Sequence, residues 1–266
     1  MIHITEEEDV TCVKLDIIME GKKINRVYVF LTDGMLVDTG PKRLVEELIP
    51  FYDKHAFDLV TLTHSHEDHT GTAPWIQENR DVPIYLHPKG IDICAKSYPY
   101  PEYRQFIWGK REKFHAIPMG DTVRSRSKEW QVIYTPGHAS DHNALYNQEA
   151  GIMFAGDLYV NPKTKVIMGS ESIPTTMDSI KKLLTYDFGA MFCCHAGYVP
   201  EGRKMIKQKL EYLENLSGEV KHLHQHGLSV EEIREKLFPE KYKIIAISGG
   251  EWDSLHVITS ILSEEI

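Results

Sequence analysis

The first part of the chain alternates between short apolar runs and polar breaks, as β-strands do. Over residues 10–19, Val13, Leu15 and Ile17 fall on one face of an alternating pattern. Further apolar runs, each closed by Gly, Pro or polar residues, occupy 26–31, 35–37, 58–62, 82–86, 130–135, 144–146, 151–155 and 191–194. Helical spacing follows Pro41, so the pattern as a whole predicts a mixed α/β fold.

Beyond residue 200 the apolar positions recur at helical spacing. They are Ile206, Leu210, Leu213, Leu216, Val220 and Leu223. Gly227 suits the end of this helix, and the run from Ser229 to Glu232 is a capping box that begins another. We therefore expect residues 1–199 to form the main domain and residues 200–266 to form a helical segment packed on it.

Three histidines and two carboxylates crowd the loop at residues 63–69, which reads THSHEDH. The loop follows the apolar run 58–62 and precedes a predicted short helix. It therefore lies at the carboxyl end of a strand, where open α/β folds commonly bind ligands. His64 and His66 are two residues apart on an extended segment, so both rings can point the same way. Because neutral imidazole is the commonest metal ligand, this loop predicts a metal site.

The pattern His64-x-His66-x-Asp68-His69 resembles the signature of the metallo-β-lactamase superfamily. Four further motifs of that superfamily have counterparts in the same order, and they contain Asp38, His138, Asp157 and His195. Together the five motifs span residues 36–197, which makes the resemblance more specific than a single motif would. It implies a four-layer αββα sandwich, in which two mixed sheets face each other and metals lie at their shared edge.

The resemblance also implies which residues bind two divalent metal ions. The expected ligands of the first ion are His64, His66 and His138. The expected ligands of the second ion are Asp68, His69 and His195, with Asp157 bridging the two ions. Asp38 is expected beneath the metals as a hydrogen-bond acceptor that orients ligand imidazoles. Zinc is the expected metal, with iron or manganese as alternatives.

Two ions held in this way imply hydrolysis, in which a hydroxide between the ions attacks a carbonyl carbon or a phosphorus. Asp68 or Asp157 would then manage the proton. The expected substrate is a small ester, thioester, lactone or phosphodiester. The alternatives are a mononuclear iron dioxygenase of the same fold and a non-catalytic metal-binding scaffold. The complete set of seven ligands favours an enzyme over a scaffold.

Composition narrows the class of protein further. Lys plus Arg is 30 and Asp plus Glu is 39, which gives a formal net charge of −9. Because the chain is acidic and lacks basic runs, we expect a small-molecule substrate and no nucleic-acid partner. We expect no membrane span, since no apolar stretch reaches about 18 residues. Four cysteines and an amino end without a signal-peptide pattern favour the cytoplasm.

Several positions have more than one interpretation. The aromatic segment at residues 91–115 could pack against the sheet, wall the substrate cleft or form a homodimer contact. His142 follows His138 closely but is left out of the ligand set, and Tyr159 receives no role. The run His222, His224 and His226 is assigned to the end of a helix rather than to a second metal site.

The segment 200–266 is expected to shape the mouth of the substrate site. Its first helix begins soon after the predicted ligand His195, so its amino end should lie near the metals. Arg203 would add a positive charge there and attract an anionic group of the substrate. Trp252 and its neighbours would bring an aromatic loop back toward the main domain.

Overall fold

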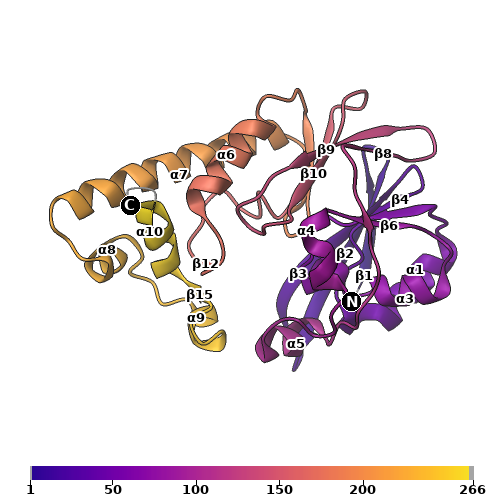
Figure 1. The fold of residues 1–266 in the computed structure, drawn as a ribbon, viewed down its shortest axis with the longest axis horizontal. Helices are drawn as coiled ribbons and strands as arrows, with labels where there is room; N and C mark the ends of the chain where they lie inside the picture. The colour runs from indigo at the N-terminus through magenta and orange to yellow at the C-terminus, as the bar shows by residue number, and fades with distance from the viewer. Residues whose placement is uncertain (1, 264–266) are drawn as a thin grey trace.

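A computed structural model of the chain describes residues 2–263 and contains two large β-sheets (Figure 1). The strands of the first sheet follow chain order: β1 (Ile2–Glu7), β2 (Val10–Met19), β3 (Lys22–Thr32), β4 (Met35–Val37), β5 (Leu59–Thr61), β6 (Ile84–Leu86) and β7 (Ile117–Pro118). The first four strands pair antiparallel, and β4 through β7 pair parallel. The parallel half places several strand ends along one edge of the sheet.

The second sheet has the strand order β14-β13-β11-β10-β9-β8. Its strands are β8 (Thr122–Arg124), β9 (Glu129–Tyr134), β10 (Asn143–Asn147), β11 (Ile152–Gly156), β13 (Ala190–Cys193) and β14 (Gly197–Val199). Only the pairing of β11 with β13 is parallel among these strands. The apolar runs at residues 144–146 and 151–155 lie in β10 and β11, which pair antiparallel as a hairpin.

The two sheets pack face to face through buried aromatic side chains. The ring of Phe30 on β3 lies 5.5 Å from that of Phe154 on β11 and 5.4 Å from that of Phe192 on β13. All three belong to one buried apolar cluster, together with alternating residues of β2 such as Val13 and Leu15. This packing confirms the predicted sandwich of two mixed sheets and explains the period-two pattern of the strands.

Helices cover the outer faces of both sheets (Figure 1). Those of the first half are α1 (Val45–Lys54), α2 (Glu67–Thr70), α3 (Ala73–Asn79), α4 (Pro88–Cys94) and α5 (Glu102–Trp108), preceded by a 3-10 turn, η1 (Lys42–Leu44). Those of the second half are α6 (Ile173–Leu183), α7 (Gly202–Gln225), α8 (Val230–Leu237), α9 (Lys243–Ile247) and α10 (Ser254–Leu262). None of the helices within residues 2–263 combines the length and the apolar content that a membrane span requires.

The helix α7 joins the last quarter of the chain to the second sheet. Ile206 on α7 and Met191 on β13 belong to the same buried cluster, which also contains Ile258 of α10. A two-stranded ribbon pairs β12 (Ile167–Met168) with β15 (Trp252–Asp253) and brings the chain back toward the middle of the molecule (Figure 1). The capping box predicted at Ser229 is present at the start of α8.

One feature was not predicted from the sequence, and one contradicts a prediction. The aromatic segment 91–115 contains helices, α5 and the end of α4, because each helix begins at or just after a proline that suits a helical start. The prediction that Arg203 attracts a substrate anion is wrong. Its guanidinium donates to the carbonyl oxygens of Leu184 and Tyr186, and it does not line the large cavity described below.

Candidate metal centre

The histidine-rich loop connects β5 to α2 as the sequence predicts. His66 is still extended, with φ −61° and ψ 150°, and it caps the single turn of α2 that carries Asp68 and His69. The change from extended to helical backbone turns Asp68 and His69 away from the direction of His64 and His66. One short loop therefore supplies side chains to two neighbouring groups.

The first group consists of His64, His66 and His138. The Nε2 atom of His64 lies 3.0 Å from Nδ1 of His66, and Nε2 of His138 lies 3.1 Å from the same Nδ1. Burial lowers the pKa of His64 and of His66 well below its ordinary value, and the neighbouring imidazoles lower it further. Neutral rings present lone pairs, so His64 and His66 each offer a nitrogen ligand, and Nε2 of His138 lies at the same point.

The loop that carries His138 depends on a glycine. Gly137 has φ +132°, and a Cβ atom built there would lie 2.4 Å from Oγ1 and 2.7 Å from the Cα of Thr176. Any other residue would therefore clash with α6 as well as strain the backbone. This close approach holds His138 at the end of β9, facing the loop after β5.

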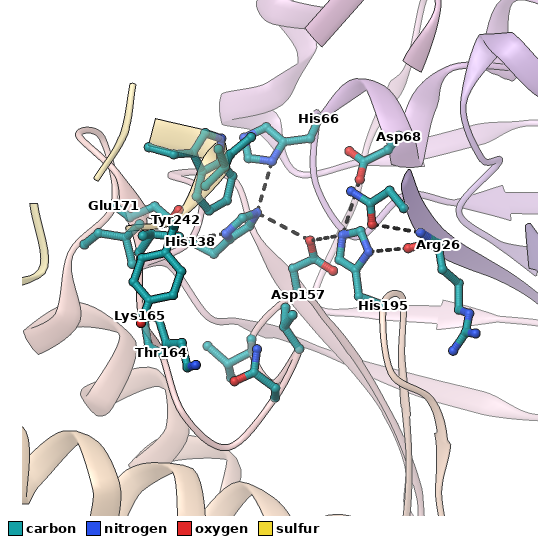
Figure 2. Close-up of a pocket in the computed structure, with 18 of the residues that line it drawn as sticks. Arg26, His66, Asp68, His138, Asp157, Thr164, Lys165, Glu171, His195 and Tyr242 are labelled. Carbon is teal, nitrogen blue, oxygen red and sulfur yellow. Dashed lines mark hydrogen bonds and ion pairs between the residues drawn. The ribbon is translucent and has the colours of Figure 1, made fainter. Parts of the chain in front are cut away.

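The second group consists of Asp68, His69, Asp157 and His195. The Oδ2 atom of Asp157 lies 3.3 Å from Nε2 of His69 and 3.1 Å from Nε2 of His195. The Nε2 atom of His195 is also 3.3 Å from Oδ2 of Asp68. The same Asp157 oxygen lies 3.6 Å from Nε2 of His138, so it stands between the two groups (Figure 2).

Charge in the second group is shared between carboxylates and imidazoles. Burial opposes the charged form of His195, yet the nearby carboxylate of Asp157 raises its pKa well above the ordinary value. Burial also opposes ionisation of Asp157, but His195 and His69 hold the pKa of its carboxyl group well below the usual range. The group therefore favours two ionised carboxylates and positive charge next to them.

Each of three histidines has its Nδ1 atom held by the protein. His69 Nδ1 donates to Oδ2 of Asp38 at 2.8 Å, and His138 Nδ1 donates to Oε2 of Glu171 at 3.0 Å. His195 Nδ1 donates to the carbonyl oxygen of Arg26 at 2.6 Å. These contacts leave the Nε2 atoms of all three rings facing the centre, as an acceptor behind a ligand histidine does in metal sites.

Asp38 takes part in a dense buried network and lies beneath the site, as the sequence predicts. Its carboxylate accepts bonds from the backbone and the hydroxyl of Thr63 and from the thiol of Cys194, besides His69. Its backbone is left-handed with φ 58°, a strained conformation for a residue other than glycine. Four hydrogen-bond donors around the Asp38 carboxylate fix both the His69 ring and the start of the histidine loop.

His142 is buried but does not face the centre. Its Nε2 accepts the backbone N–H of Asp157 at 3.0 Å, and its Nδ1 lies 2.8 Å from Oγ1 of Thr135. The ring therefore supports the backbone beneath Asp157, consistent with its omission from the predicted ligands. The residue before Asp157 is a glycine because a Cβ atom there would lie 2.4 Å from this ring nitrogen.

The donor set fits divalent cations. The chemically suitable atoms of each group lie within 4.8 Å of one another. In addition, His69 Nε2 and Asp157 Oδ1 are buried without a hydrogen-bond partner among the described residues, an arrangement that proteins avoid unless another group satisfies the atoms. Imidazole nitrogens and carboxylate oxygens are ligands that divalent metals such as zinc accept, so the residues present suit divalent metal binding.

All seven predicted ligands thus meet at one place, although the first and the last of them, His64 and His195, are 131 residues apart in the chain. The predicted histidine run at the end of α7 does not join them: within residues 2–263, no candidate metal group includes His222, His224 or His226. The residues that the sequence analysis missed are Glu171 and the carbonyl of Arg26. Glu171 is 33 residues from His138 in the chain, and no motif marks it.

The site opens into a cavity of about 880 Å³ (Figure 2). Ile107 and Trp108 of α5 line one side, and Tyr242, Ile244 and Trp252 of the last quarter of the chain line another. The aromatic segment therefore contributes to the cleft, while other members of it point outward, such as Phe106, which is 65% exposed. Trp252 lies in the cavity wall, as expected for a segment that shapes the mouth.

Comparison with known proteins agrees with this geometry. Residues 27–195 match the Metallo-beta-lactamase superfamily. A beta-lactamase-like protein 2 homolog from Caenorhabditis elegans is 25% identical over 191 residues, which cover 68% of this chain and 57% of that protein. An atrochrysone carboxyl ACP thioesterase from Aspergillus fumigatus is 26% identical over 183 residues, which cover 67% of this chain and 52% of that enzyme. The chain therefore spans little more than half the length of these two relatives.

A solved structure shares the fold over almost the whole chain. A metallo-beta-lactamase family protein from Thermus thermophilus superposes with a TM-score of 0.73, covering 97% of this chain and 94% of the other. Its sequence is only 18% identical, so the likeness shows a common fold and leaves the reaction of each protein open.

Proposed function

Because this chain belongs to the metallo-beta-lactamase superfamily, we propose that it is a hydrolase that uses two divalent metal ions. The observation that carries the proposal is the position of Asp157 Oδ2, within 3.6 Å of nitrogen donors from both groups. A single carboxylate oxygen between two complete donor sets suits a pair of ions better than one ion. The second group also argues against a mononuclear dioxygenase, because it brings four more donors of its own.

The proposed ligands divide between the ions as the geometry groups them. His64, His66 and His138 would hold the first ion, and Asp68, His69 and His195 would hold the second, with Asp157 shared. Ions bound in this way would lower the pKa of a water molecule toward about 7 and would polarise a carbonyl or phosphoryl oxygen. Zinc is the metal that the nitrogen-rich set favours most.

The chain's own residues have separate tasks in this proposal. Asp38, Glu171 and the carbonyl of Arg26 hold three ligand rings in one orientation. Asp68 is 6% exposed beside the cavity and can accept a proton from an attacking water or return it to a leaving group. The apolar cavity walls exclude bulk water from the reacting atoms, which strengthens electrostatic interactions there.

The proposed substrate is a small ester or thioester, with lactones and phosphodiesters as further possibilities of the same chemistry. A relative that is a thioesterase supports this class, and the cavity of about 880 Å³ has room for a group larger than acetyl. We also propose that residues 200–266 form part of the same catalytic unit as residues 1–199, because residues of both line this cavity.

The test combines metal analysis with an activity panel. The purified protein should contain about two equivalents of divalent metal per chain, by plasma mass spectrometry, and it should hydrolyse at least one chromogenic ester, thioester, lactone or bis(p-nitrophenyl) phosphate. His138→Ala should abolish that activity, because the first group keeps only two nitrogen donors. The matched control is His222→Ala, which removes an exposed histidine outside the site.

Two results would count against the proposal. One is a metal content that stays near a single equivalent under saturating zinc. The other is a fully loaded protein that hydrolyses nothing in the panel, or that keeps its full rate when His138 is replaced.

A further inference from the structure

A buried lysine lines the cavity next to the candidate metal centre. Lys209 lies on α7 and is only 6% exposed. Its Nζ donates to the carbonyl oxygens of Leu158 and Tyr159, each at 2.8 Å. These two carbonyls belong to the residues that directly follow Asp157. The sequence shows Lys209 only as one polar position beside the apolar face of a helix.

The hydrogen bonds of Lys209 leave one of its donors unused. An ammonium group has three N–H donors, and only two protein acceptors are within hydrogen-bond distance among residues 2–263. In the same part of the chain no carboxylate comes close enough to Lys209 to form an ion pair. A buried cation without an anionic partner is costly, and burial accordingly lowers the pKa of Lys209 to about 8. The group is still mainly protonated at neutral pH.

The wall of the cavity is basic although the chain is acidic. Six Lys or Arg residues line it, namely Lys23, Arg26, Arg104, Lys163, Lys165 and Lys209. Among residues 2–263, only three acidic residues line it, Asp68, Asp157 and Glu171, and all three belong to the candidate metal centre or contact it. Although the whole chain has a formal net charge of −9, this local excess of basic residues favours anions in the cavity.

Four of the six basic residues already have a carboxylate partner. Lys23 and Arg26 pair with Asp16, Arg104 pairs with Glu67, and Lys165 pairs with Glu240. Among residues 2–263, only Lys163 and Lys209 line the cavity without such a partner, and Lys163 is exposed at the rim. Lys209 is therefore the cation best placed to contact an anionic group of a substrate that is bound inside the cavity.

The rest of the wall is apolar and aromatic. Ile107 and Trp108 come from α5, Val166 lies just before β12, and Ile167 and Trp252 belong to the two strands of the ribbon. Such a wall suits an extended hydrocarbon or aromatic group, since burying it yields about 25 cal/mol for each Å² removed from water. The cavity thus combines a reactive centre, an apolar wall and one buried cation.

We propose that Lys209 binds a carboxylate of the substrate, and that the substrate is an ester or thioester whose acyl chain is apolar and ends in that carboxylate. This inference rests on the proposed hydrolase function, which identifies the ester or thioester bond that is broken. The new element is the substrate carboxylate that Lys209 recognises. Lys209 is an anion-binding residue here, and it need not touch the reacting atoms.

The test uses pairs of substrates that differ in one charge. The metal-loaded protein is given mono(4-nitrophenyl) esters of straight-chain dicarboxylic acids with four to eight carbons. Each is compared with the mixed diester that keeps the 4-nitrophenyl ester and carries a methyl ester in place of the free carboxylate. Lys209→Gln keeps a donor for the two carbonyls and removes the charge. It should lower kcat/KM for the best half-ester by about 10- to 100-fold, and change that for the methyl diester by less than about 3-fold.

Control variants separate charge recognition from support of the backbone. Lys207→Met removes an exposed lysine from the same helix and should leave kcat/KM unchanged for both substrates. Lys209→Met removes both the charge and the donors, and metal content is measured for every variant. Equal losses for both substrates in Lys209→Gln, or no loss for either, would overturn the proposal. A loss seen only in Lys209→Met, together with reduced metal content, would show that Lys209 merely supports the backbone after Asp157.

Failure of the hydrolase proposal can be told apart from failure of this one. If the wild-type protein cleaves neither ester, binding of the same pairs is measured by titration of the fluorescence of Trp108 and Trp252 in the cavity wall. A preference for the half-ester that disappears in Lys209→Gln supports carboxylate binding without hydrolysis. If the wild-type protein and Lys209→Gln bind the half-ester with equal affinity, carboxylate binding by Lys209 is refuted.

Discussion

A buried ion pair next to the histidine loop offers a quantitative test of the structure. Arg104 of α5 reaches Glu67 of the loop with two parallel bonds, Nε to Oε1 at 2.5 Å and Nη2 to Oε2 at 2.6 Å. The exposed fractions of the two side chains are 12% and 1%. A further contact of 3.4 Å joins Arg104 to Glu251, just before the ribbon strand β15. One guanidinium thus connects three distant segments of the chain.

Replacing Arg104 with Met should strongly destabilise the protein. The change leaves the Glu67 carboxylate buried without a partner, and loss of one member of a buried pair costs about 3–5 kcal/mol. For a chain of this size that corresponds to a fall of about 6–20 °C in the melting temperature. The measurement is thermal and urea unfolding at pH 7 with saturating zinc, followed by circular dichroism.

Two control variants test whether the loss of stability comes from the unpaired buried charge of Glu67. Arg124→Met breaks the pair with Glu129, whose side chains are 81% and 51% exposed, and should cost less than about 1 kcal/mol. The double variant Glu67→Gln/Arg104→Met removes the unpaired charge and should recover part of the stability lost in the single variant. If Arg104→Met costs no more than Arg124→Met, the pair is not buried as described and the reasoning is refuted.

Further predictions concern the metal ligands and one turn. His64→Ala should abolish hydrolysis, whereas His195→Ala should mainly remove the second equivalent of metal, as measured by plasma mass spectrometry. Asp157→Ala should weaken both sites, so retention of two equivalents would exclude it as the shared ligand. Glu171→Gln should lower zinc affinity about 10- to 100-fold in a competition titration with a chelator, because His138 loses its ionised acceptor. Asp33→Asn should lower the free energy of unfolding by about 1 kcal/mol at pH 7. Burial opposes ionisation of Asp33, but hydrogen bonds from Ser125, Ser127 and Lys128 outweigh it and hold the pKa of Asp33 at about 2. The stability difference from wild type should therefore disappear as the pH falls from about 4 to 2.

The convergence of the candidate ligands was predictable because they occur in short motifs at the ends of strands. His64, His66, Asp68 and His69 share one loop, and the turn from β5 into α2 directs them as the local pattern suggests. The face-to-face sheets likewise follow from the alternation along β2 and β3. Location in the cytoplasm and formation of a homodimer stay predictions.

Other features could not be predicted because they depend on tertiary contacts between distant residues. Glu171 lies 33 residues from His138, and its role is visible only once α6 packs beside the loop after β9. The carbonyl of Arg26 leaves no mark in a sequence, since every residue has one. Phe106 and Trp108 are two residues apart on a helix, so one faces solvent while the other is 7% exposed in the cavity wall.

The seven candidate ligands are divided between the two halves of the sandwich. Four follow β5 of the first sheet, and three follow strands of the second, so neither donor group is complete within one half. A chain cut between β7 and β8 would yield two fragments, one for each large sheet, that separately lack a full set of candidate ligands. Metal would then act as the joint between them, and zinc at 100 times its dissociation constant would favour their association by about 2.7 kcal/mol. If the intact protein binds metal as proposed, the same linkage would make metal supply a determinant of how long the folded chain survives proteolysis.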